Sequence, residues 1–221
     1  MSTPKLTIKY FDIAGRAEAA RLLLAMGNVP FTDEFLEGEA FAALKPLCPF
    51  GQVPVLQIGE DGKLLAQSGA INLYCAKLAK LYPEDPVDAA FCDMVVCQAS
   101  DCFEPLLATM GIKDPEAKLQ TRADLVKPTG QVGARINSLS AYLTSLKSDF
   151  FGGATPDFAD VIVYQNFSFI QSGFLDGVPL TVLADFPVIK AHHARMAAYP
   201  SIAEYYKRTN NPKRLGLTTV A

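Results

Sequence analysis

A tyrosine near the start of the chain lies where a predicted strand gives way to a predicted helix. Leu6, Ile8 and Tyr10 alternate with polar residues, and this period of two predicts a strand. A short loop containing Gly15 then leads to a helix that begins near Arg16. Such a junction presents backbone N–H groups at the helix start, so the Tyr10 hydroxyl could donate a hydrogen bond to an anion bound there. An ordinary strand tyrosine is the alternative interpretation.

Two further segments carry groups that suit a peptide-like ligand. Val53-Pro54 opens a predicted strand, and a cis bond there would let the Val53 backbone pair with a ligand as an added strand does. A trans proline at the start of a strand is the alternative. Gln67-Ser68 begins a predicted helix, with Ser68 as its N-cap. A helix start with a free hydroxyl also suits a carboxylate, and capping alone is the alternative.

The elements that must position these residues alternate between strand and helix periods. Apolar residues from Ala19 to Met26 mark one helix face, which Gly27 ends as a C-cap would. Asp-Gly at 61–62 is a tight-turn signal between two short strands. The predicted order is β-α-β-α-β-β-α: a strand at 6–10, a helix at 19–26, a strand at 31–37, a short helix at 39–47, strands at 55–58 and 63–66, and a helix at 68–80.

The rest of the chain is predicted to be entirely helical. Lys80–Pro86 holds two prolines and two acids, which is linker chemistry, and it predicts domains at 1–82 and 86–221. Asp157 and Asp160 stand where an N-cap and the third helical position would carry acids. The helix from 161 to 170 is apolar on nearly all sides, so we expect it at the centre of this domain. Further apolar faces are formed by Val87, Phe91, Met94 and Val95, by Val132, Ile136, Leu139, Leu143 and Leu146, and by Phe186, Ile189, His193 and Met196, and a last helix starts at Pro200.

Composition excludes several classes of function. The 221 residues carry 20 Lys+Arg and 23 Asp+Glu, a net charge of −3, which does not suit a nucleic-acid binder or a basic membrane-surface protein. No apolar stretch reaches the roughly 18 residues that a membrane span needs. The polar start is unlike a signal peptide, and the five Cys are odd in number, so we expect a reduced cytoplasmic protein. Because the chain has only two His and no CxxC motif, we expect no metal site.

Taken together and in order, the three segments resemble the cytosolic glutathione transferases. The motifs are Tyr10 followed by Arg16-Ala17-Glu18, then Phe50–Pro54, then Leu65–Ile71. The resemblance covers essentially the whole chain, and Tyr10-Phe11 with Gly15–Glu18 is most similar to the sigma class, with mu and alpha more distant. It implies an α/β thioredoxin-like N-terminal domain and an all-α C-terminal domain. It also implies glutathione as cosubstrate, no metal, and a homodimer.

The resemblance implies a role for each matching residue. Tyr10 would hydrogen-bond the glutathione sulfur and favour the thiolate, with Arg16 supporting the electrostatics. Gln67 and Ser68 would hold the γ-glutamyl end, and Lys45 would pair with the glycyl carboxylate. Phe41 stands where sigma-class members often have Trp, and the chain contains no Trp. The full implied glutathione set is Tyr10, Phe41, Lys45, Gln52, Val53, Pro54 (cis), Gln67, Ser68 and Asp101.

Two parts of the implied site lie in the helical domain. Asp101 matches an acid that reaches the γ-glutamyl amine across a dimer interface, although a solvated acid on a helix face is the alternative. The hydrophobic substrate site is expected between the domains, with plain packing as the alternative for each residue. Its candidates are Ile13, Phe103, Leu107, Met110 and Leu217.

We therefore predict a glutathione transferase that acts in detoxification by attaching the thiolate to hydrophobic electrophiles, with peroxidase activity as a possible addition. Two alternatives stay open: a glutathione-dependent isomerase of the prostaglandin D synthase type, and a non-catalytic ligand-binding or structural member. Cys48-Pro49 resembles a redox motif, yet a redox Cys is expected at the first helix, so we predict Cys48 to be structural. Adjacent His192 and His193 point apart on a helix and are predicted to be packed rather than ligands.

Overall fold

The computed structural model describes residues 4–60 and 62–211, which group into two compact units. Residues 4–82 and 204–211 form the first unit, and Pro83–Ala203 form the second. The predicted ranges, 1–82 and 86–221, place residues 204–211 in the helical domain, whereas the structure groups them with the first unit. One bond that joins them there is a hydrogen bond of 2.6 Å, donated by the Asn211 side-chain amide to Asp12 Oδ1.

The first unit contains a mixed sheet of the strands β1 (Leu6–Tyr10), β2 (Thr32–Phe35), β3 (Val55–Ile58) and β4 (Leu64–Ala66). Their order is β2-β1-β3-β4, with β1 parallel to β2 and the other two pairs antiparallel. Alternate residues of β1 are buried, which confirms the period of two. Tyr10 pairs with Phe35 and is the last residue of β1, so its side chain lies where this inner strand ends.

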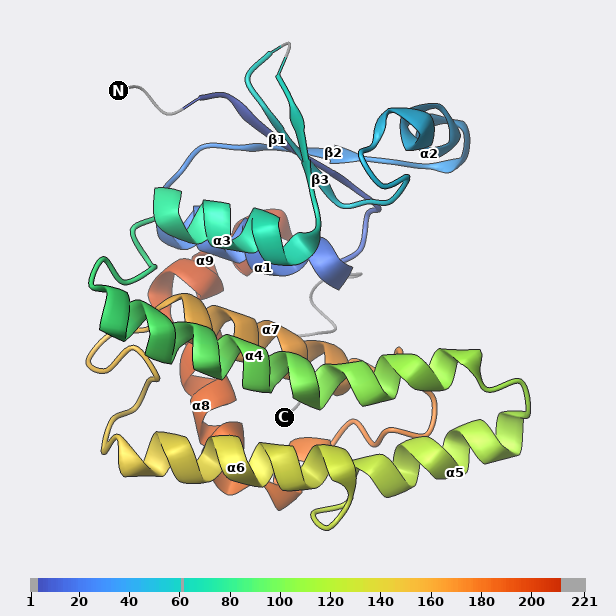
Figure 1. Cartoon of the computed structure of the whole chain (residues 1–221), viewed down its shortest axis with the longest axis vertical. Coiled ribbons are helices and arrows are strands. Elements are labelled where there is room, and N and C mark those ends of the chain that lie inside the picture. Colours follow the sequence, from blue (N-terminus) through green and yellow to red (C-terminus); the bar gives the residue numbers. More distant parts are fainter. Residues whose placement is uncertain (1–3, 61, 212–221) are drawn as a thin grey trace. The chain divides into compact units, whose positions relative to one another are not determined.

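The helices α1 (Glu18–Met26) and α3 (Ser68–Leu78) lie together on one side of the sheet, and α2 (Gly38–Leu44) lies at its end (Figure 1). Gly27 ends α1 as predicted. A Cβ at Gly27 would lie 2.5 Å from Ala79 Cα, so a glycine is needed where α1 meets the end of α3. The thioredoxin-like order β-α-β-α-β-β-α is confirmed, with the 3₁₀ turns Gly15–Ala17 before α1 and Lys45–Leu47 after α2.

The second unit is helical, as predicted. Residues of α7 are buried at every position except Phe169, which confirms α7 as the centre of this unit. In Figure 1, α4, α6, α7 and α8 lie close together within the unit. Its helices are α4 (Pro86–Ala108), α5 (Pro115–Val126), α6 (Gln131–Ser145), α7 (Phe158–Ile170), α8 (Pro187–Ala197) and the first residues of α9 (Pro200–Thr209), with 3₁₀ turns at Thr109–Gly111 and Val182–Asp185.

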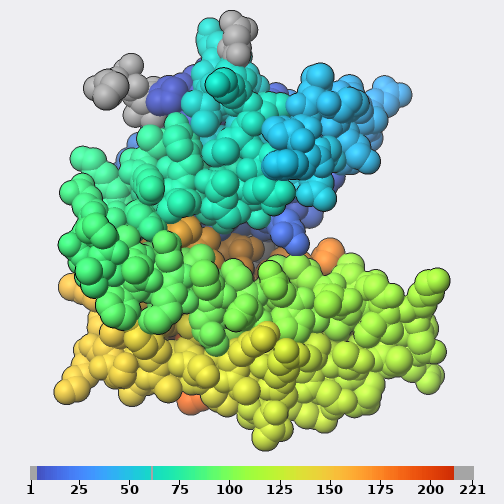
Figure 2. All heavy atoms as spheres, viewed as in Figure 1, coloured from blue at the N-terminus to red at the C-terminus, as the bar shows by residue number. Residues whose placement is uncertain are grey.

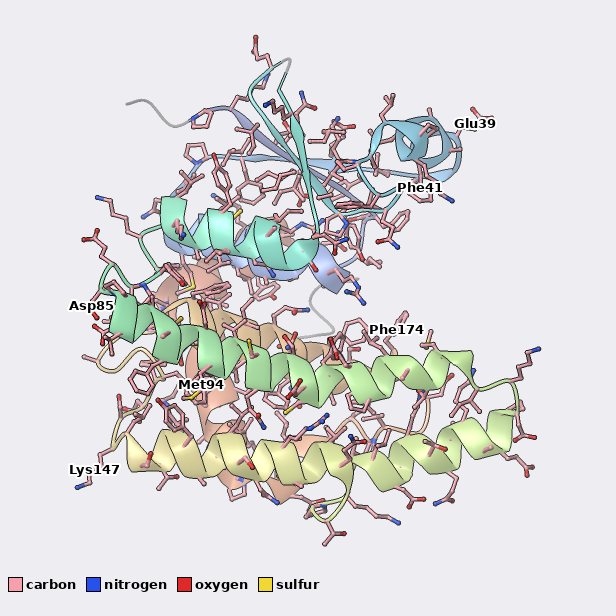
Figure 3. All side chains as sticks on the ribbon, in the orientation of Figure 1. Glu39, Phe41, Asp85, Met94, Lys147 and Phe174 are labelled. Carbon is pink, nitrogen blue, oxygen red and sulfur yellow. The ribbon has the colours of Figure 1, made fainter. Side chains whose placement is uncertain are left out.

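The apolar residues of α4 are distributed differently from the sequence expectation. Val87, Phe91 and Met94 are 62%, 54% and 44% exposed, although Val95 is buried. The buried face of α4 consists largely of small side chains, including Cys92 and Ala99. Figure 2 shows α4 (green) and α6 (yellow) side by side at the surface of the unit, and Figure 3 labels Met94 on α4. The helical spacing was therefore predicted correctly, but it did not identify which face is covered.

The predicted acids form a capping box at the start of α7. Asp157 accepts hydrogen bonds from the N–H groups of Ala159 and Asp160, and the Asp160 carboxylate accepts one from the Asp157 N–H. Asp160 is fully buried and also contacts His192 Nε2 at 2.7 Å. Burial and the neighbouring Asp160 charge raise the pKa of Asp157 to about 7.

Both histidines of α8 are packed, as predicted. His192 is fully buried against Asp160, and His193 contacts Ser168 Oγ at 2.8 Å. Burial lowers the pKa of His193 to about 4, so this ring is neutral at ordinary pH. The two side chains bind different partners, which agrees with the expectation that adjacent helical positions point apart.

Candidate active site

A cavity of about 460 Å³ opens on the first unit beside the end of β1 and the start of α3. Eight of the nine predicted glutathione contacts line it, together with Arg16, and Asp101 is the exception. The structure therefore brings together residues that are distant in the sequence and that were selected from its motifs. The lining residues are Tyr10, Phe11, Arg16, Phe41, Lys45, Phe50, Gly51, Gln52, Val53, Pro54, Ala66, Gln67 and Ser68.

Tyr10 is held tightly where β1 ends. Its side chain is 7% exposed, and its hydroxyl oxygen accepts a hydrogen bond of 3.3 Å from the Arg16 backbone N–H. Gly15 lies against it with a φ of +45°, and a Cβ on Gly15 would lie 2.7 Å from the Tyr10 oxygen. A hydroxyl can accept one bond and donate another, so the Tyr10 proton is available for an anionic atom in the cavity.

The Val53 backbone borders the cavity outside the sheet. The Val53–Pro54 peptide bond is cis, as expected, and Pro54 is buried. The ladder between β3 and β4 begins at Val55, so Val53 lies beyond the paired residues. This placement leaves the Val53 backbone beside the cavity and outside the β3–β4 ladder, where a peptide-like ligand could add its own backbone hydrogen bonds.

The start of α3 differs from the expectation in one detail. Gln67, with a φ of +72°, is the residue that flanks the helix, and Ser68 is its first helical residue rather than its N-cap. The Gln67 side chain makes no capping hydrogen bond. The first N–H groups of α3 thus meet the cavity together with these two side chains, and a helix start of this kind favours a carboxylate.

The charges around the cavity favour an anion. Arg16 and Lys45 are exposed cations, and no acidic residue stands among the described residues that line the cavity. A carboxylate-bearing ligand would therefore meet two positive groups and a helix start without a like charge in the lining. This is the electrostatic setting that an anionic tripeptide needs.

Aromatic side chains form one wall. The Tyr10 and Phe11 ring centroids are 5.3 Å apart, and Phe11 meets Phe41 edge-on at 5.2 Å. Phe41 comes from α2 and is labelled in Figure 3. Four lining residues were not predicted as contacts: Phe11, Gly51 and Ala66, which directly adjoin predicted contacts, and Phe50, which lies two positions before Gln52. Proximity to the motifs was the available signal for all of them.

Asp101 lies in the helical unit. It is exposed on α4 and lines a separate cavity of about 510 Å³ formed by α4, α5 and α6. The Arg135 guanidinium donates to its backbone carbonyl. Asp101 is therefore not among the described residues that line the first cavity.

The predicted acceptor residues are distributed over both units, and Leu217 lies outside the described residues. Ile13 and Met110 are 39% and 53% exposed, and Leu107 is half-buried. Phe103 packs edge-on against Phe169 at 5.1 Å. Phe169 in turn lies 5.1 Å from Phe174, an exposed aromatic residue that the sequence analysis did not select. These aromatic contacts make Phe169 and Phe174 further candidates for an apolar ligand surface.

Both halves of the chain match known protein families. Residues 6–77 match the family model for the glutathione S-transferase N-terminal domain, and residues 100–209 match that for the C-terminal domain. Over 178 residues the chain is 32% identical to Glutathione S-transferase 4 of Caenorhabditis elegans, covering 78% of this chain and 84% of that protein. The chain belongs to the glutathione S-transferase family. It is an enzyme of that family, and the family uses glutathione as cosubstrate.

Two further relatives extend the comparison over nearly the whole chain. Hematopoietic prostaglandin D synthase of Gallus gallus is 29% identical over 205 residues, covering 93% of this chain and 96% of that protein. The crystal structure of the glutathione S-transferase from Ascaris lumbricoides matches with a TM-score of 0.76 at 26% identity, over 95% and 98% of the two chains. The thioredoxin-like and helical units are therefore those of a glutathione S-transferase.

The remaining observations concern Cys48, possible metal ligands and membrane-spanning helices. Cys48 is buried against Val55 and Ala66, and burial raises the pKa of its thiol, as expected for a structural cysteine. Over residues 4–60 and 62–211, no group of His, Cys, Asp and Glu could hold a metal ion. None of the helices within the same ranges is long and apolar enough to cross a membrane.

Proposed function

We propose that this glutathione S-transferase joins the glutathione thiolate to hydrophobic electrophiles in the first-unit cavity. The observation that carries the proposal is the Tyr10 hydroxyl, which accepts from the Arg16 N–H and keeps its own proton for a ligand. A hydrogen bond from Tyr10 to the glutathione sulfur stabilises the thiolate relative to the thiol. Because a free thiol has a pKa near 8.5, this raises the fraction of nucleophile at neutral pH.

The rest of the lining supports a placement for the tripeptide. The γ-glutamyl carboxylate binds Gln67, Ser68 and the N–H groups at the start of α3. The cysteinyl backbone pairs with Val53, next to Pro54 and Gln52. The glycyl carboxylate faces Lys45. Phe41 lies beside it and, unlike the Trp that sigma-class members often have there, offers no indole N–H. Arg16 adds positive charge near the sulfur.

The reaction then needs only the thiolate and an acceptor. The sulfur forms a bond to an electrophilic carbon while the leaving group departs with the bonding electron pair, and the thiol proton passes to solvent. The proposed acceptor residues are Ile13, Phe103, Leu107 and Met110, which offer apolar surface to such a substrate. Through this reaction the enzyme would act in detoxification.

A homodimer is part of the proposal. Val87, Phe91 and Met94 form an exposed apolar stripe on α4, and exposed patches of this kind are typical of protein contacts. Asp101 lies further along the same helix. If a partner covers this stripe, Asp101 is placed near that partner and could reach its bound γ-glutamyl amine. A cytoplasmic location is likewise a prediction.

A second candidate function is a glutathione-dependent isomerisation. The similarity to hematopoietic prostaglandin D synthase, at 29% identity over nearly the whole length, favours it. The sigma class is the finer family assignment, which the Tyr10-Phe11 pair and Gly15–Glu18 support. Both reactions use the same thiolate, so Tyr10 has the same role in each.

An activity panel with glutathione tests and separates these functions. The substrates are an aryl halide, an organic hydroperoxide and a prostaglandin endoperoxide, each measured with wild type and Tyr10→Phe. Conjugation is supported if the aryl halide is turned over and Tyr10→Phe lowers kcat by about 10²-fold, the lower end of the range for a positioned proton-donating group. Turnover of the endoperoxide alone would replace conjugation by isomerisation. Equal turnover by the two proteins would contradict the role of Tyr10.

A further inference from the structure

A fully buried arginine lies behind the proposed catalytic tyrosine. Arg21 is on α1 and has 0% exposure, which is unusual for an arginine. Its guanidinium carbon lies 5.9 Å from the centroid of the Tyr10 ring, within the range of a cation–π contact. It does not line the cavity, so it is not placed to touch a ligand.

The guanidinium bonds three separate parts of the unit. Its Nη1 donates to the backbone carbonyls of Ile13 at 2.8 Å and Ala14 at 3.2 Å, and to the Glu18 carboxylate at 3.0 Å. Its Nε lies 2.9 Å from an oxygen of Asp33 on β2. One side chain therefore joins the loop after β1, the first turn of α1 and the neighbouring strand.

The loop that Arg21 holds is the one that positions the Tyr10 hydroxyl. Ala14 is followed by Gly15, which packs against the tyrosine oxygen, and by Arg16, whose N–H donates to that oxygen. A shift of the Ala14 carbonyl would therefore also move the Arg16 N–H that donates to the tyrosine oxygen. If Arg21 served only to pair with Glu18 and Asp33, it would not need to donate to the carbonyls of Ile13 and Ala14 as well.

We propose that Arg21 is a positioning residue for thiolate stabilisation, acting through the 13–16 loop and the Tyr10 ring. This inference rests on the proposed function of Tyr10. By fixing the Arg16 N–H on the hydroxyl oxygen, Arg21 polarises the O–H bond that is donated to sulfur. A lysine cannot replace it, because an ammonium group is a single point and lacks the planar fork that spans the carbonyls and Asp33 together.

The variant Arg21→Lys tests this while keeping the buried charge. We expect the pKa of glutathione bound to the enzyme, followed by thiolate ultraviolet absorbance, to rise by about one unit, and kcat to fall about 10-fold. The KM for glutathione should change less than about 3-fold, because Arg21 touches no ligand. A merely structural arginine would alter stability without moving the thiol pKa.

Arg122→Lys is the matched control. Arg122 is 2% exposed in the helical unit, and its guanidinium also bonds a backbone carbonyl, that of Asp176, and a side chain, that of Thr109. Its replacement should lower stability and leave the thiol pKa unchanged. If Arg21→Lys does not fold, Glu18→Gln/Arg21→Gln replaces the pair by neutral side chains and is judged by the same shifts.

The outcomes separate the two proposals. An unshifted thiol pKa and unchanged kcat in a folded Arg21 variant overturn the positioning role. If Tyr10→Phe raises the thiol pKa while the Arg21 variant does not, the proposed function stands and only the inference fails. If Tyr10→Phe has no effect either, the proposed function fails and the inference falls with it.

Discussion

At the scale of single residues, the site depends on how closely backbone approaches the Tyr10 hydroxyl. The Arg16 N–H donates to that oxygen, a Cβ added to Gly15 would lie 2.7 Å from it, and Gly15 adopts a φ of +45°. A side chain at position 15 would meet the hydroxyl itself. The proposed hydrogen bond from Tyr10 to sulfur should therefore be sensitive to the residue that follows Ala14, even though that residue carries no functional group.

Gly15→Ala tests this contact, with Gly38→Ala as its matched control. Gly38 also has a positive φ, of +37°, but a Cβ there would meet nothing within 4 Å. Both variants should lose roughly 1 kcal/mol of unfolding free energy from the strained backbone. Turnover measured with an aryl halide should fall only for Gly15→Ala. Equal turnover in the two variants would show that the contact with Tyr10 is unimportant.

Lys45 provides a second residue-scale prediction. It is an exposed cation in the cavity lining, so Lys45→Gln should raise the KM for glutathione about 3- to 10-fold, as expected for an exposed charge pair of about 1 kcal/mol. The effect should shrink at high salt because the charges are screened. Lys63→Gln, an exposed lysine outside the lining, is the control. A salt-independent KM in wild type would contradict the carboxylate contact.

The residues of the cavity were more predictable than their detailed geometry. Tyr10, Val53 and Ser68 stood at element boundaries, where strand and helix periods end, and those boundaries converge at one edge of the sheet. Phe50 carried no such signal, because its place depends on the turn before Pro54. Ser68 was predicted as a cap, but the cap position belongs to Gln67, since helix boundaries depend on backbone angles that the sequence does not display.

At the scale of elements, α7 is stabilised by an unusual pair of acids. Asp157 has a folded pKa of about 7 against an ordinary 3.8, so between these values the folded state holds a proton that the unfolded state has lost. Stability contributed at this position must therefore fall as pH rises through that window. His193 acts in the opposite sense: its folded pKa of about 4 is below the ordinary 6.5, so its contribution rises with pH between them.

Asp157→Asn isolates the acid. Asn keeps a side-chain oxygen for capping but carries no charge. From about pH 5 to pH 8, wild type should lose about 2 to 3 kcal/mol of unfolding free energy relative to the variant. Urea unfolding at several pH values measures this difference, in which the His193 contribution cancels. A difference that is constant with pH would contradict the raised pKa.

At the scale of the whole molecule, the fold follows from periodicity but the assembly does not. The periods of β1, α1 and α7 predicted both units, because each of these elements has a face that can only be buried. The helix α4 carries apolar residues on two faces, and its spacing did not reveal that Phe91 and Met94 are exposed. Similarly, no periodicity places residues 204–211 with the first unit.

The exposed stripe on α4 predicts the oligomeric state. Phe91→Glu places a charge in the proposed contact, so it should convert a dimer into a monomer at micromolar concentration. Leu119→Glu, at a 42% exposed position on α5, is the control and should leave the dimer intact. Sedimentation velocity measures both. A Phe91→Glu protein that sediments like wild type would place the interface elsewhere.

The central claim is that Tyr10 stabilises the thiolate of bound glutathione. The most direct measurement is the pKa of that thiol, obtained from thiolate absorbance across a pH series for wild type and Tyr10→Phe. We predict a value well below the free-thiol value of about 8.5 in wild type, and a rise of about one unit or more in Tyr10→Phe. The same low value in both proteins, with glutathione still bound, would contradict the account.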